Sequence, residues 1–298
     1  MKKSILYILL GCALSGLSSC SEDKLGETIF PDVPLLDEGS ATYGFDLWLD
    51  NNYLKPYNLD FRYKLQDVGS DMDYNLVPAK LSISEQMARL VKYLWFDVYG
   101  TVVNEEFLKY YGPRIIHLIG SSAYNPAQGT EVLGTAEGGL KVTLYNCNNL
   151  NISDINMMNE YFFKTMHHEF AHILHQKKSY PKDFDMLCAG YYQPNGWAER
   201  TDEDAWKLGF ASNYGSSEGR EDFVEVIANF IIKNDAEWNH MLEVAATGTE
   251  VEGRKIIEQK LDICKTWLRD SWEIDLDKLR AEVHYRQDNL DMDELMKD

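Results

Sequence analysis

The segment MHHEFAHILHQ (residues 166–176) contains three side chains whose types and spacing suit metal chemistry. Residues four apart lie on one face of a helix, so His168 and His172 can both offer an imidazole to one ion. Glu169, next to His168, can reach a water on that ion and act as a general base. Because the same pattern also arises by chance in amphipathic helices, the interpretation as a zinc site depends on finding further ligands.

A catalytic zinc site has a third protein ligand and one open position. His175 lies on the same helix face, but the helix rise puts it about 10 Å along the axis from His168, too far to share the ion. A metzincin pattern, HExxHxxGxxH, would need glycine in place of His175 and histidine in place of Lys178. We therefore expect His175 to line the cleft or to contact a ligand histidine, and His167 to be structural or exposed.

A better source of the third ligand is the segment YGSSEGREDFVEVIANF (214–230). Glu221 and Glu225 are four residues apart on one face of a predicted helix. Glu221 can therefore bind the zinc while Glu225 accepts the second ring N–H of a ligand histidine and fixes its tautomer. Acidic residues are also common at helix starts, where the dipole favours them. We prefer the ligand interpretation because a two-histidine site needs a carboxylate, with Glu225 or Asp222 as the alternative ligand.

Two helices must position these residues. Apolar side chains at helical spacing predict one long helix over residues 154–176, which carries the histidines, and another over EDFVEVIANFII (221–232). The 49 positions from His172 to Glu221 are ample to bring the second helix beside the first. The intervening segment 177–197 has a loop-like composition, and we expect its aromatic residues to fill the core rather than a cleft: Tyr191, Tyr192 and Trp197.

Strand-like patterns precede these helices, and further helical patterns follow them. A helix is predicted over residues 82–100, a buried strand over PRIIHLIGSS (113–122), and two strands over TEVLGTAEGGLKVTLYN (130–146). From about residue 235 onward the chain reads as helices. Strands first and helices later predict an α+β fold with a helical C-terminal part. We interpret His117, inside a predicted strand, as a core residue rather than a metal ligand.

The first 20 residues, MKKSILYILLGCALSGLSSC, combine a basic start, a short apolar run and small residues before Cys20. This pattern is typical of an export signal, and its end resembles the lipobox of bacterial lipoproteins. We expect removal of residues 1–19, lipidation of Cys20 and anchoring to a membrane by more than one acyl chain. Residues 20–40, with charges, two prolines and glycine, then form a flexible tether.

The charge and the remaining cysteines exclude other classes of function. The formal net charge is −19, and loss of two lysines with residues 1–19 would make it −21. So acidic a surface argues against nucleic-acid binding and against unaided adhesion to anionic lipid. Cys147, Cys188 and Cys264 are scattered without a CxxC pattern, so we expect free thiols rather than a disulfide framework or a cysteine metal site.

At these motifs the chain resembles the gluzincin metallopeptidases. It resembles in particular the zinc-binding metallopeptidase lipoproteins of Gram-negative bacteria, also called substrate import-associated zinc metallohydrolases. The resemblance covers HEFAH (168–172), Trp197, DAWKLGFASNYGSS (204–217) and EDFVE (221–225). The chain is more distantly similar to the catalytic domain of anthrax lethal factor, in which an HExxH helix is followed by a tyrosine and a glutamate ligand that opens an ExFxE motif.

The resemblance implies roles for individual residues. His168, His172 and Glu221 would bind Zn²⁺, and Glu225 would orient a ligand histidine. Tyr214 would donate its hydroxyl to the developing oxyanion, a charge that a preorganised donor stabilises.

It also implies a zincin-like domain, with a mixed sheet packed on the HExxH helix and an edge strand lining the cleft. We expect that edge at GGLKVTLYN (138–146), where a substrate backbone could add as an extra strand.

Taken together, we expect a catalytic domain over residues 41–235 and a helical extension over 236–298. The predicted function is that of a zinc metallohydrolase anchored by lipid to the bacterial outer membrane. Among such hydrolases we favour a peptidase that acts on peptides or proteins. Glu22 and Asp23 after the cysteine resemble surface-export signals, and the family suggests a place beside a nutrient importer. The alternatives are a non-catalytic surface lipoprotein that binds polymer or importer, and a zinc hydrolase of a non-peptide amide. An intact Glu169 favours the enzyme.

Overall fold

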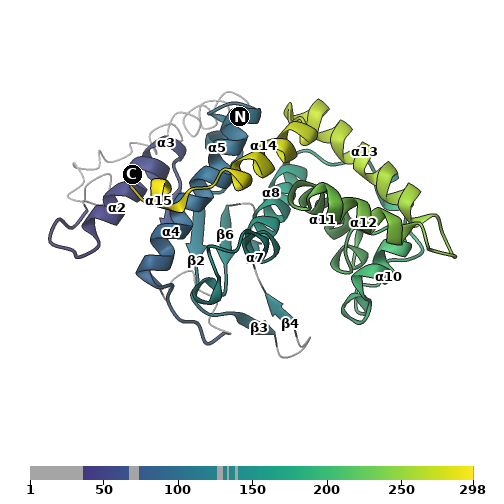
Figure 1. Ribbon diagram of the computed structural model, residues 1–298, viewed down its shortest axis with the longest axis horizontal. Helices are drawn as coiled ribbons and strands as arrows, with labels where there is room; N and C mark the ends of the chain where they lie inside the picture. Colours follow the sequence, from purple (N-terminus) through teal and green to yellow (C-terminus); the bar gives the residue numbers. More distant parts are fainter. Residues whose placement is uncertain (1–35, 67–73, 126–129, 133, 138–139, 298) are drawn as a thin grey trace, which may run out of the picture. The chain divides into compact units, whose positions relative to one another are not determined.

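The computed structural model describes residues 36–66, 74–125, 130–132, 134–137 and 140–297 (Figure 1). The predicted export signal, Cys20 and most of the predicted tether lie outside these residues. The chain divides into two compact units, Met1–Tyr43 and Gly44–Asp298, and all elements named below from residue 44 onward belong to the second. Within the described residues, every helix is too short or too polar to cross a membrane.

A small mixed sheet forms one layer of the second unit. Its strand order is β1 (Asp60–Arg62), β2 (Ile115–Leu118), β6 (Lys141–Leu144) and β5 (Gly134–Glu137). The first three strands are parallel, and β5 is antiparallel to β6. Helices cover the face of the sheet on which the apolar side chains of β2 and β6 are buried.

One prediction about the sheet is wrong. The segment 138–146, expected at the edge, contributes β6, which pairs with β2 on one side and with β5 on the other. All four residues of β6 are buried, as suits an interior strand. Among the described strands of this sheet, the outermost one on this side is β5, from the other strand-like run of the sequence.

Helix α8 (Lys164–Lys177) lies against this outer strand. A Cβ atom added to Gly134 in β5 would lie 2.2 Å from Cγ2 of Thr165, so only glycine permits so close an approach of strand and helix. A separate two-stranded ribbon, β3 (Ala123–Asn125) with β4 (Thr130–Val132), precedes β5 in the chain. The sheet and the helix that carries His168 and His172 are thus in direct contact.

The helices confirm the sequence pattern with small changes at their ends. The predicted helix over 154–176 is a continuous helical segment made of α7 (Ile155–Met158), the π-helical turn η4 (Asn159–Phe163) and α8. Asp154 caps its start by accepting hydrogen bonds from the backbone of Asn156 and Met157. The remaining helical segments before it are α2 (Tyr43–Leu49), η1 (Asp50–Leu54), α3 (Lys55–Tyr57), α4 (Leu81–Val91), η2 (Lys92–Phe96), α5 (Asp97–Val102), α6 (Phe107–Tyr111) and η3 (Cys147–Asn149).

The second predicted helix is α11 (Gly219–Ile232), which packs along α8. Both helices bury their apolar stripes in one large core: Phe170, Ile173 and Leu174 from α8, and Val224, Ile227 and Ile231 from α11. Between them in the chain lie the short elements α9 (Asp183–Met186), η5 (Trp197–Glu199), α10 (Asp202–Lys207) and η6 (Tyr214–Ser216). Burial of these stripes holds the two helices side by side.

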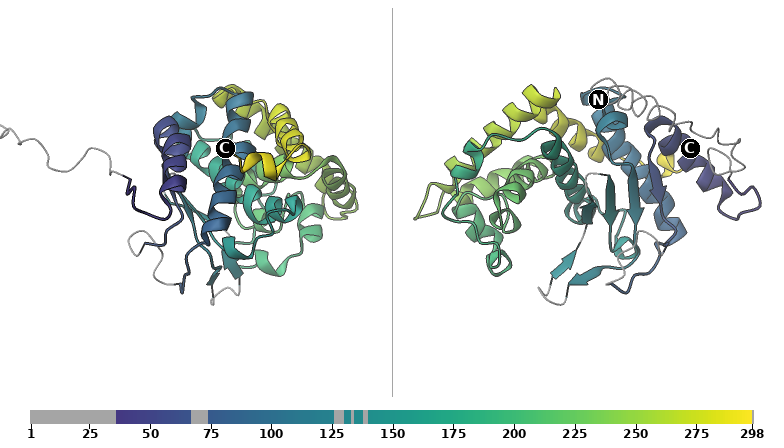
Figure 2. Two further views of the ribbon diagram at one scale, coloured as in Figure 1. Left: turned by 60° about the vertical axis from the view of Figure 1, so that its left-hand side comes forward. Right: turned by 180° about the vertical axis from the view of Figure 1, so that it is seen from behind.

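The C-terminal part is helical, as predicted. It contains α12 (Asp235–Ala245), α13 (Gly253–Trp272), α14 (Leu276–Asp288) and α15 (Met292–Leu295). Helices α13 and α14 both contact α11, and their apolar residues belong to the same core as the sheet and α8 (Figure 2). The α+β fold with a helical C-terminal part is therefore confirmed, and its C-terminal helices support the helix that carries Glu221.

Candidate metal centre

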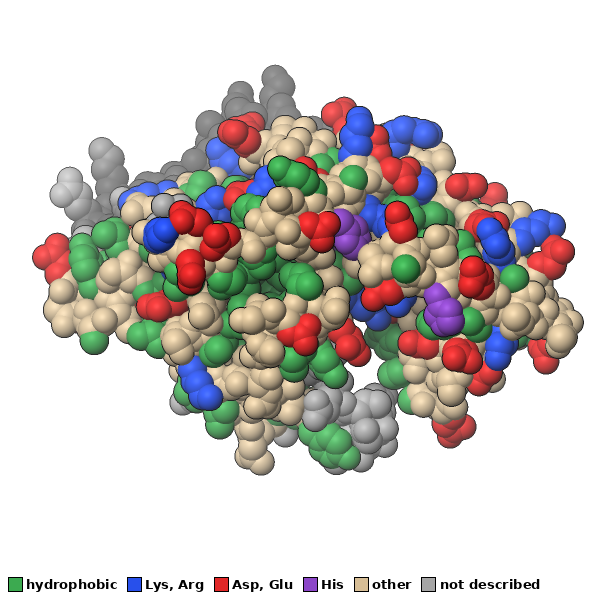
Figure 3. Space-filling model, viewed as in Figure 1, with side chains coloured by type: hydrophobic (Ala, Val, Ile, Leu, Met, Phe, Trp, Pro, Cys, Tyr) green, Lys and Arg blue, Asp and Glu red, His purple; other side chains and the backbone are tan. Residues whose placement is uncertain are grey.

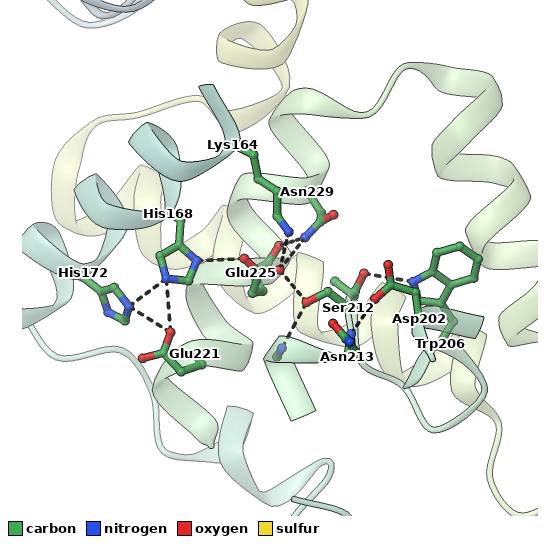
Figure 4. Close-up of polar contacts among 12 residues, drawn as sticks. Lys164, His168, His172, Asp202, Trp206, Ser212, Asn213, Glu221, Glu225 and Asn229 are labelled. Carbon is green, nitrogen blue, oxygen red and sulfur yellow. Dashed lines mark hydrogen bonds and ion pairs between the residues drawn. The ribbon is translucent and has the colours of Figure 1, made fainter. Parts of the chain in front are cut away.

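The two packed helices bring three predicted ligands together (Figure 4). Nε2 of His168 and Nε2 of His172, one turn apart on α8, are 3.2 Å from each other. Each of these nitrogens is also 3.2 Å from Oε2 of Glu221, in the first turn of α11. Three donor atoms from two helices therefore face one common point.

The spacing of these atoms fits zinc. Ligand atoms placed tetrahedrally at zinc's usual bond lengths of about 2.0–2.2 Å lie about 3.3–3.6 Å from one another, just above the edges observed here. The observed triangle has edges of 3.2 Å. Two imidazoles and one carboxylate are also a known catalytic donor set, and three protein ligands leave the fourth position free for reactants. The residues present thus fit a catalytic zinc ion.

Each ligand histidine has a partner for its other ring nitrogen. Nδ1 of His168 is 2.8 Å from Oε1 of Glu225, and Nδ1 of His172 is 2.8 Å from Nε2 of His175. Since Nε2 of each ligand faces the metal position, Nδ1 must carry the ring proton and donate it in these contacts. Glu225 and His175 therefore fix the tautomer and the orientation of the two rings.

His175 is suited to accept this hydrogen bond. Burial first, and then the neighbouring His172 and Arg220, lower the pKa of His175 to about 4. The ring is therefore neutral at pH 7 and has a free lone pair on Nε2 for His172.

Glu225 is the centre of a buried network. Its Oε2 accepts hydrogen bonds from Oγ of Ser212 and Nδ2 of Asn229, and it pairs with Nζ of Lys164 at 2.9 Å. Burial alone would raise the pKa of Glu225, but Lys164, His168 and Ser212 outweigh it and hold the pKa well below its usual range. Glu225 therefore stays ionised and rigidly placed behind His168.

The predicted ligands shift one another's pKa values in the metal-free protein. Burial alone would lower the pKa of His168, but hydrogen bonds to Glu221 and Glu225 outweigh it and raise the pKa to about 9. Burial opposes ionisation of Glu221, yet hydrogen bonds from His168 and His172 hold its pKa well below the usual range. Glu221 and Glu225 therefore favour positive charge at this position, as a ring proton on His168 in the metal-free protein or as a bound cation in its place.

Glu169 lies on α8 beside the ligand triangle and is 9% exposed. Its negative charge contributes to the raised pKa of His168 and to the raised pKa of Tyr214. A general base must lie near the metal, and a position next to a ligand histidine on the same helix suits that role.

Tyr214 also lies at the site, on η6 just before α11. Its ring centroid is 5.8 Å from that of His168 and 4.9 Å from that of Trp197. Burial, followed by the charge of Glu221, raises the pKa of Tyr214 above its usual value, so the phenol keeps its proton at neutral pH. A protonated hydroxyl beside the ligands can donate to an oxyanion.

The structure separates other candidates from the metal position. Of the two alternative ligands, Glu225 contacts Nδ1 of His168, and Asp222 is fully buried and pairs with Lys260. His117 is buried in β2, and His167 is buried with Nδ1 3.2 Å from the hydroxyl of Tyr99. His167 is therefore structural, which is one of the two roles predicted for it.

The aromatic residues of the loop follow the prediction only in part. All three are half-buried; Tyr191 and Tyr192 pack on a small cluster around Phe210, whereas Trp197 packs on Tyr214 at the site. The three predicted free thiols are confirmed, each of them buried.

Sequence reasoning missed three residues around Glu225, namely Lys164, Ser212 and Asn229. Lys164 is one helical turn before His168, and Asn229 is one turn after Glu225, so the four-residue spacing could have indicated both. Ser212 lies in a loop, where no helical spacing relates it to Glu225.

Comparison with known proteins agrees with this geometry. A family model described as "Putative zinc-binding metallo-peptidase" matches residues 39–277, most of the chain. The chain belongs to this family. It is also similar to the crystal structure of a chain titled a putative zinc-binding metallo-peptidase from Bacteroides caccae, with 44% identity and a TM-score of 0.72 over 84% of this chain and 94% of that one. No curated protein matches the chain.

The predicted family and the zinc cofactor are therefore confirmed. Because the family match extends from residue 39 to residue 277, it includes α13 as well as the two helices that carry the ligands.

Proposed function

We propose that this member of the zinc-binding metallopeptidase family hydrolyses peptide bonds with a gluzincin-type site formed by His168, His172 and Glu221. The observation that carries the proposal is the triangle of 3.2 Å edges between their donor atoms. The family match supports a peptide as the substrate class.

When bound, zinc supplies a Lewis acid that lowers the pKa of a water toward neutrality and polarises the scissile carbonyl. Glu169 takes a proton from the attacking water and later gives it to the leaving amine, so the carboxylate ends as it began. Tyr214 donates its hydroxyl proton in a hydrogen bond to the carbonyl oxygen as negative charge develops there.

Figure 3 shows a hollow in the surface between the part of the molecule with the β3–β4 ribbon and the part with α10. Figure 1 has the same viewpoint as Figure 3, and in it α8 and α11 are drawn above the position of this hollow. We propose that an extended peptide enters here, so that its backbone passes the ligand triangle.

The test is cleavage of a peptide library by the wild type and by Glu169→Gln, with the zinc content of both samples measured. We expect both proteins to hold one zinc per chain and only the wild type to cleave. Glu160→Gln is a matched control, because Glu160 precedes α8 in the same helical segment and is exposed. Zinc retention without peptide cleavage in the wild type would contradict the peptidase proposal and favour a non-peptide amide or a binding role.

We further propose that the protein is anchored through lipid on Cys20 to the outer membrane, facing the cell surface, beside a nutrient importer. The support is the sequence LSSC (17–20), the acidic residues after it and the resemblance to importer-associated lipoproteins. The test is whether Cys20→Ser releases the protein from membranes and whether an importer co-purifies with the wild type. A membrane fraction unchanged by Cys20→Ser would contradict the anchor.

A further inference from the structure

A buried ion pair joins α13 to the start of α11. Lys260 of α13 and Asp222 of α11 are both completely buried, with Nζ of Lys260 2.5 Å from Oδ2 of Asp222. The same ammonium donates to the backbone carbonyl of Gly209 at 2.8 Å and lies 3.1 Å from Sγ of Cys188. The hydroxyl of Tyr192 donates a further hydrogen bond of 2.8 Å to Oδ2 of Asp222.

This ion pair restrains the residue next to a metal ligand. Asp222 follows Glu221 directly, and successive residues of a helix point about 100° apart. Fixing the direction of Asp222 therefore fixes the direction in which Glu221 leaves the helix. The restraint matters here because Glu218, at the N-cap of α11, makes no side-chain capping hydrogen bond.

Helix α13 also holds the end of the other metal-binding helix. Nε1 of Trp267 donates to the carbonyl of Ser179 at 3.1 Å, just beyond α8. Lys178 donates to the carbonyl of Ser271 and lies over the ring of Trp272, 4.2 Å from its centroid. One helix thus contacts the start of α11 and the end of α8, the two elements whose separation sets the ligand triangle.

Stability alone is a poor explanation for such a pair. Two charges lose their hydration on burial, and replacing a buried ion pair by apolar side chains of similar volume is often neutral or stabilising. Geometric definition is the contribution that apolar side chains would not reproduce, because an ion pair with several hydrogen bonds fixes direction as well as distance.

We propose that Lys260 is a positioning residue of the metal centre. Through Asp222 it fixes the first turn of α11 and directs Glu221 toward His168 and His172, so α13 sets the affinity for zinc. The inference rests on the ligand set of the proposed function and does not depend on the substrate.

The test measures zinc affinity by competition with a chelator, together with thermal stability. Lys260→Met/Asp222→Leu removes both charges and leaves an apolar contact, so we expect it to fold with a Tm near that of the wild type. Its zinc dissociation constant should nevertheless rise by roughly tenfold or more, the effect typical of residues that orient ligands. Lys255→Met is the control, because Lys255 is an exposed lysine on the same helix and should leave affinity unchanged.

A second comparison separates positioning from general loosening of the fold. In a Glu221→Gln background, the double change Lys260→Met/Asp222→Leu should weaken zinc binding no further, because the residue that the ion pair positions is no longer a strong ligand. Should the double apolar variant fail to fold, Tyr192→Phe tests the same restraint without removing a charge, with an expected weakening of a few fold. Wild-type zinc affinity in a well-folded variant of either kind would overturn the proposal.

The test of Lys260 and the test of the proposed function can fail independently. Zinc affinities decide this inference even if the wild type cleaves no peptide. If the wild type binds no zinc, the ligand set is wrong, and the positioning role of Lys260 is contradicted as well.

Discussion

Nδ1 of His168 lies 2.8 Å from Oε1 of Glu225, a carboxylate that is 2% exposed and ionised. From this contact we infer that Glu225 affects metal binding although its carboxylate does not face the metal position. It holds the imidazole with Nε2 toward Glu221 and increases the basicity of the ligand nitrogen.

Replacing Glu225 should therefore weaken zinc binding. We expect Glu225→Gln to raise the zinc dissociation constant by about tenfold to a hundredfold, since loss of a partner behind a ligand histidine has effects of this size. The measurement is chelator competition at pH 7.5 with a zinc-sensitive dye.

Glu218→Gln is the matched control for this change, because Glu218 is exposed at the start of the same helix. Equal affinities of Glu225→Gln and the control would show that the 2.8 Å contact does not support the metal.

His175 should support His172 in the same way. Its neutral ring accepts a hydrogen bond from Nδ1 of His172 at 2.8 Å. We expect His175→Leu to weaken zinc binding by roughly tenfold and His175→Gln, which keeps an acceptor, to restore part of the loss. Isothermal titration with zinc measures both. Identical affinities for the two variants would contradict a role for this hydrogen bond.

Loss of the Tyr214 hydroxyl should affect the reaction more than the metal. We expect Tyr214→Phe to lower kcat by about 10²–10³-fold, the usual effect of removing one oxyanion donor, with zinc content unchanged. Steady-state kinetics on a cleaved peptide, with zinc quantified in each sample, provide the check. Tyr110→Phe, at a side chain that is 60% exposed, is the control. A variant with wild-type kcat would remove Tyr214 from the mechanism.

Much of the site follows from local sequence because helical geometry is local. His168 and His172 are four residues apart, as are Glu221 and Glu225. This spacing places each pair on one helix face, independently of the tertiary structure. The structure brings these residues together, with the three predicted ligand atoms 3.2 Å apart.

Contacts between distant elements were not predictable in the same way. The pairing of Lys260 with Asp222 joins residues 38 positions apart, and neither residue carries a periodic signal for the other. The edge strand was misplaced for a similar reason, since the apolar pattern of β6 indicates burial but not which strands flank it. Strand order depends on the whole fold, whereas helix faces do not.

His167 should make stability depend on pH. Burial lowers its pKa in the folded protein to about 3, whereas an unfolded histidine has a pKa of about 6.5. Between these values the unfolded chain binds more protons, so the free energy of unfolding falls as pH decreases from about 6.5 toward 3. His167→Gln removes this contribution.

We therefore expect the metal-free wild type to lose more stability than metal-free His167→Gln between pH 6.5 and 4.5, with a difference in slope approaching about 1.4 kcal/mol per pH unit. Urea unfolding at a series of pH values measures it. Parallel pH profiles for the two proteins would mean that His167 does not stay neutral in the folded state.

An anomalous difference map at the zinc edge, from crystals of the purified protein, shows whether His168, His172 and Glu221 bind one zinc ion. We expect one strong peak about 2.0–2.2 Å from Nε2 of both histidines and from a carboxylate oxygen of Glu221, with Glu225 outside bonding distance. A peak bound by Glu225 or His175 in place of Glu221, or no peak in crystals grown with zinc, would rule out this ligand set.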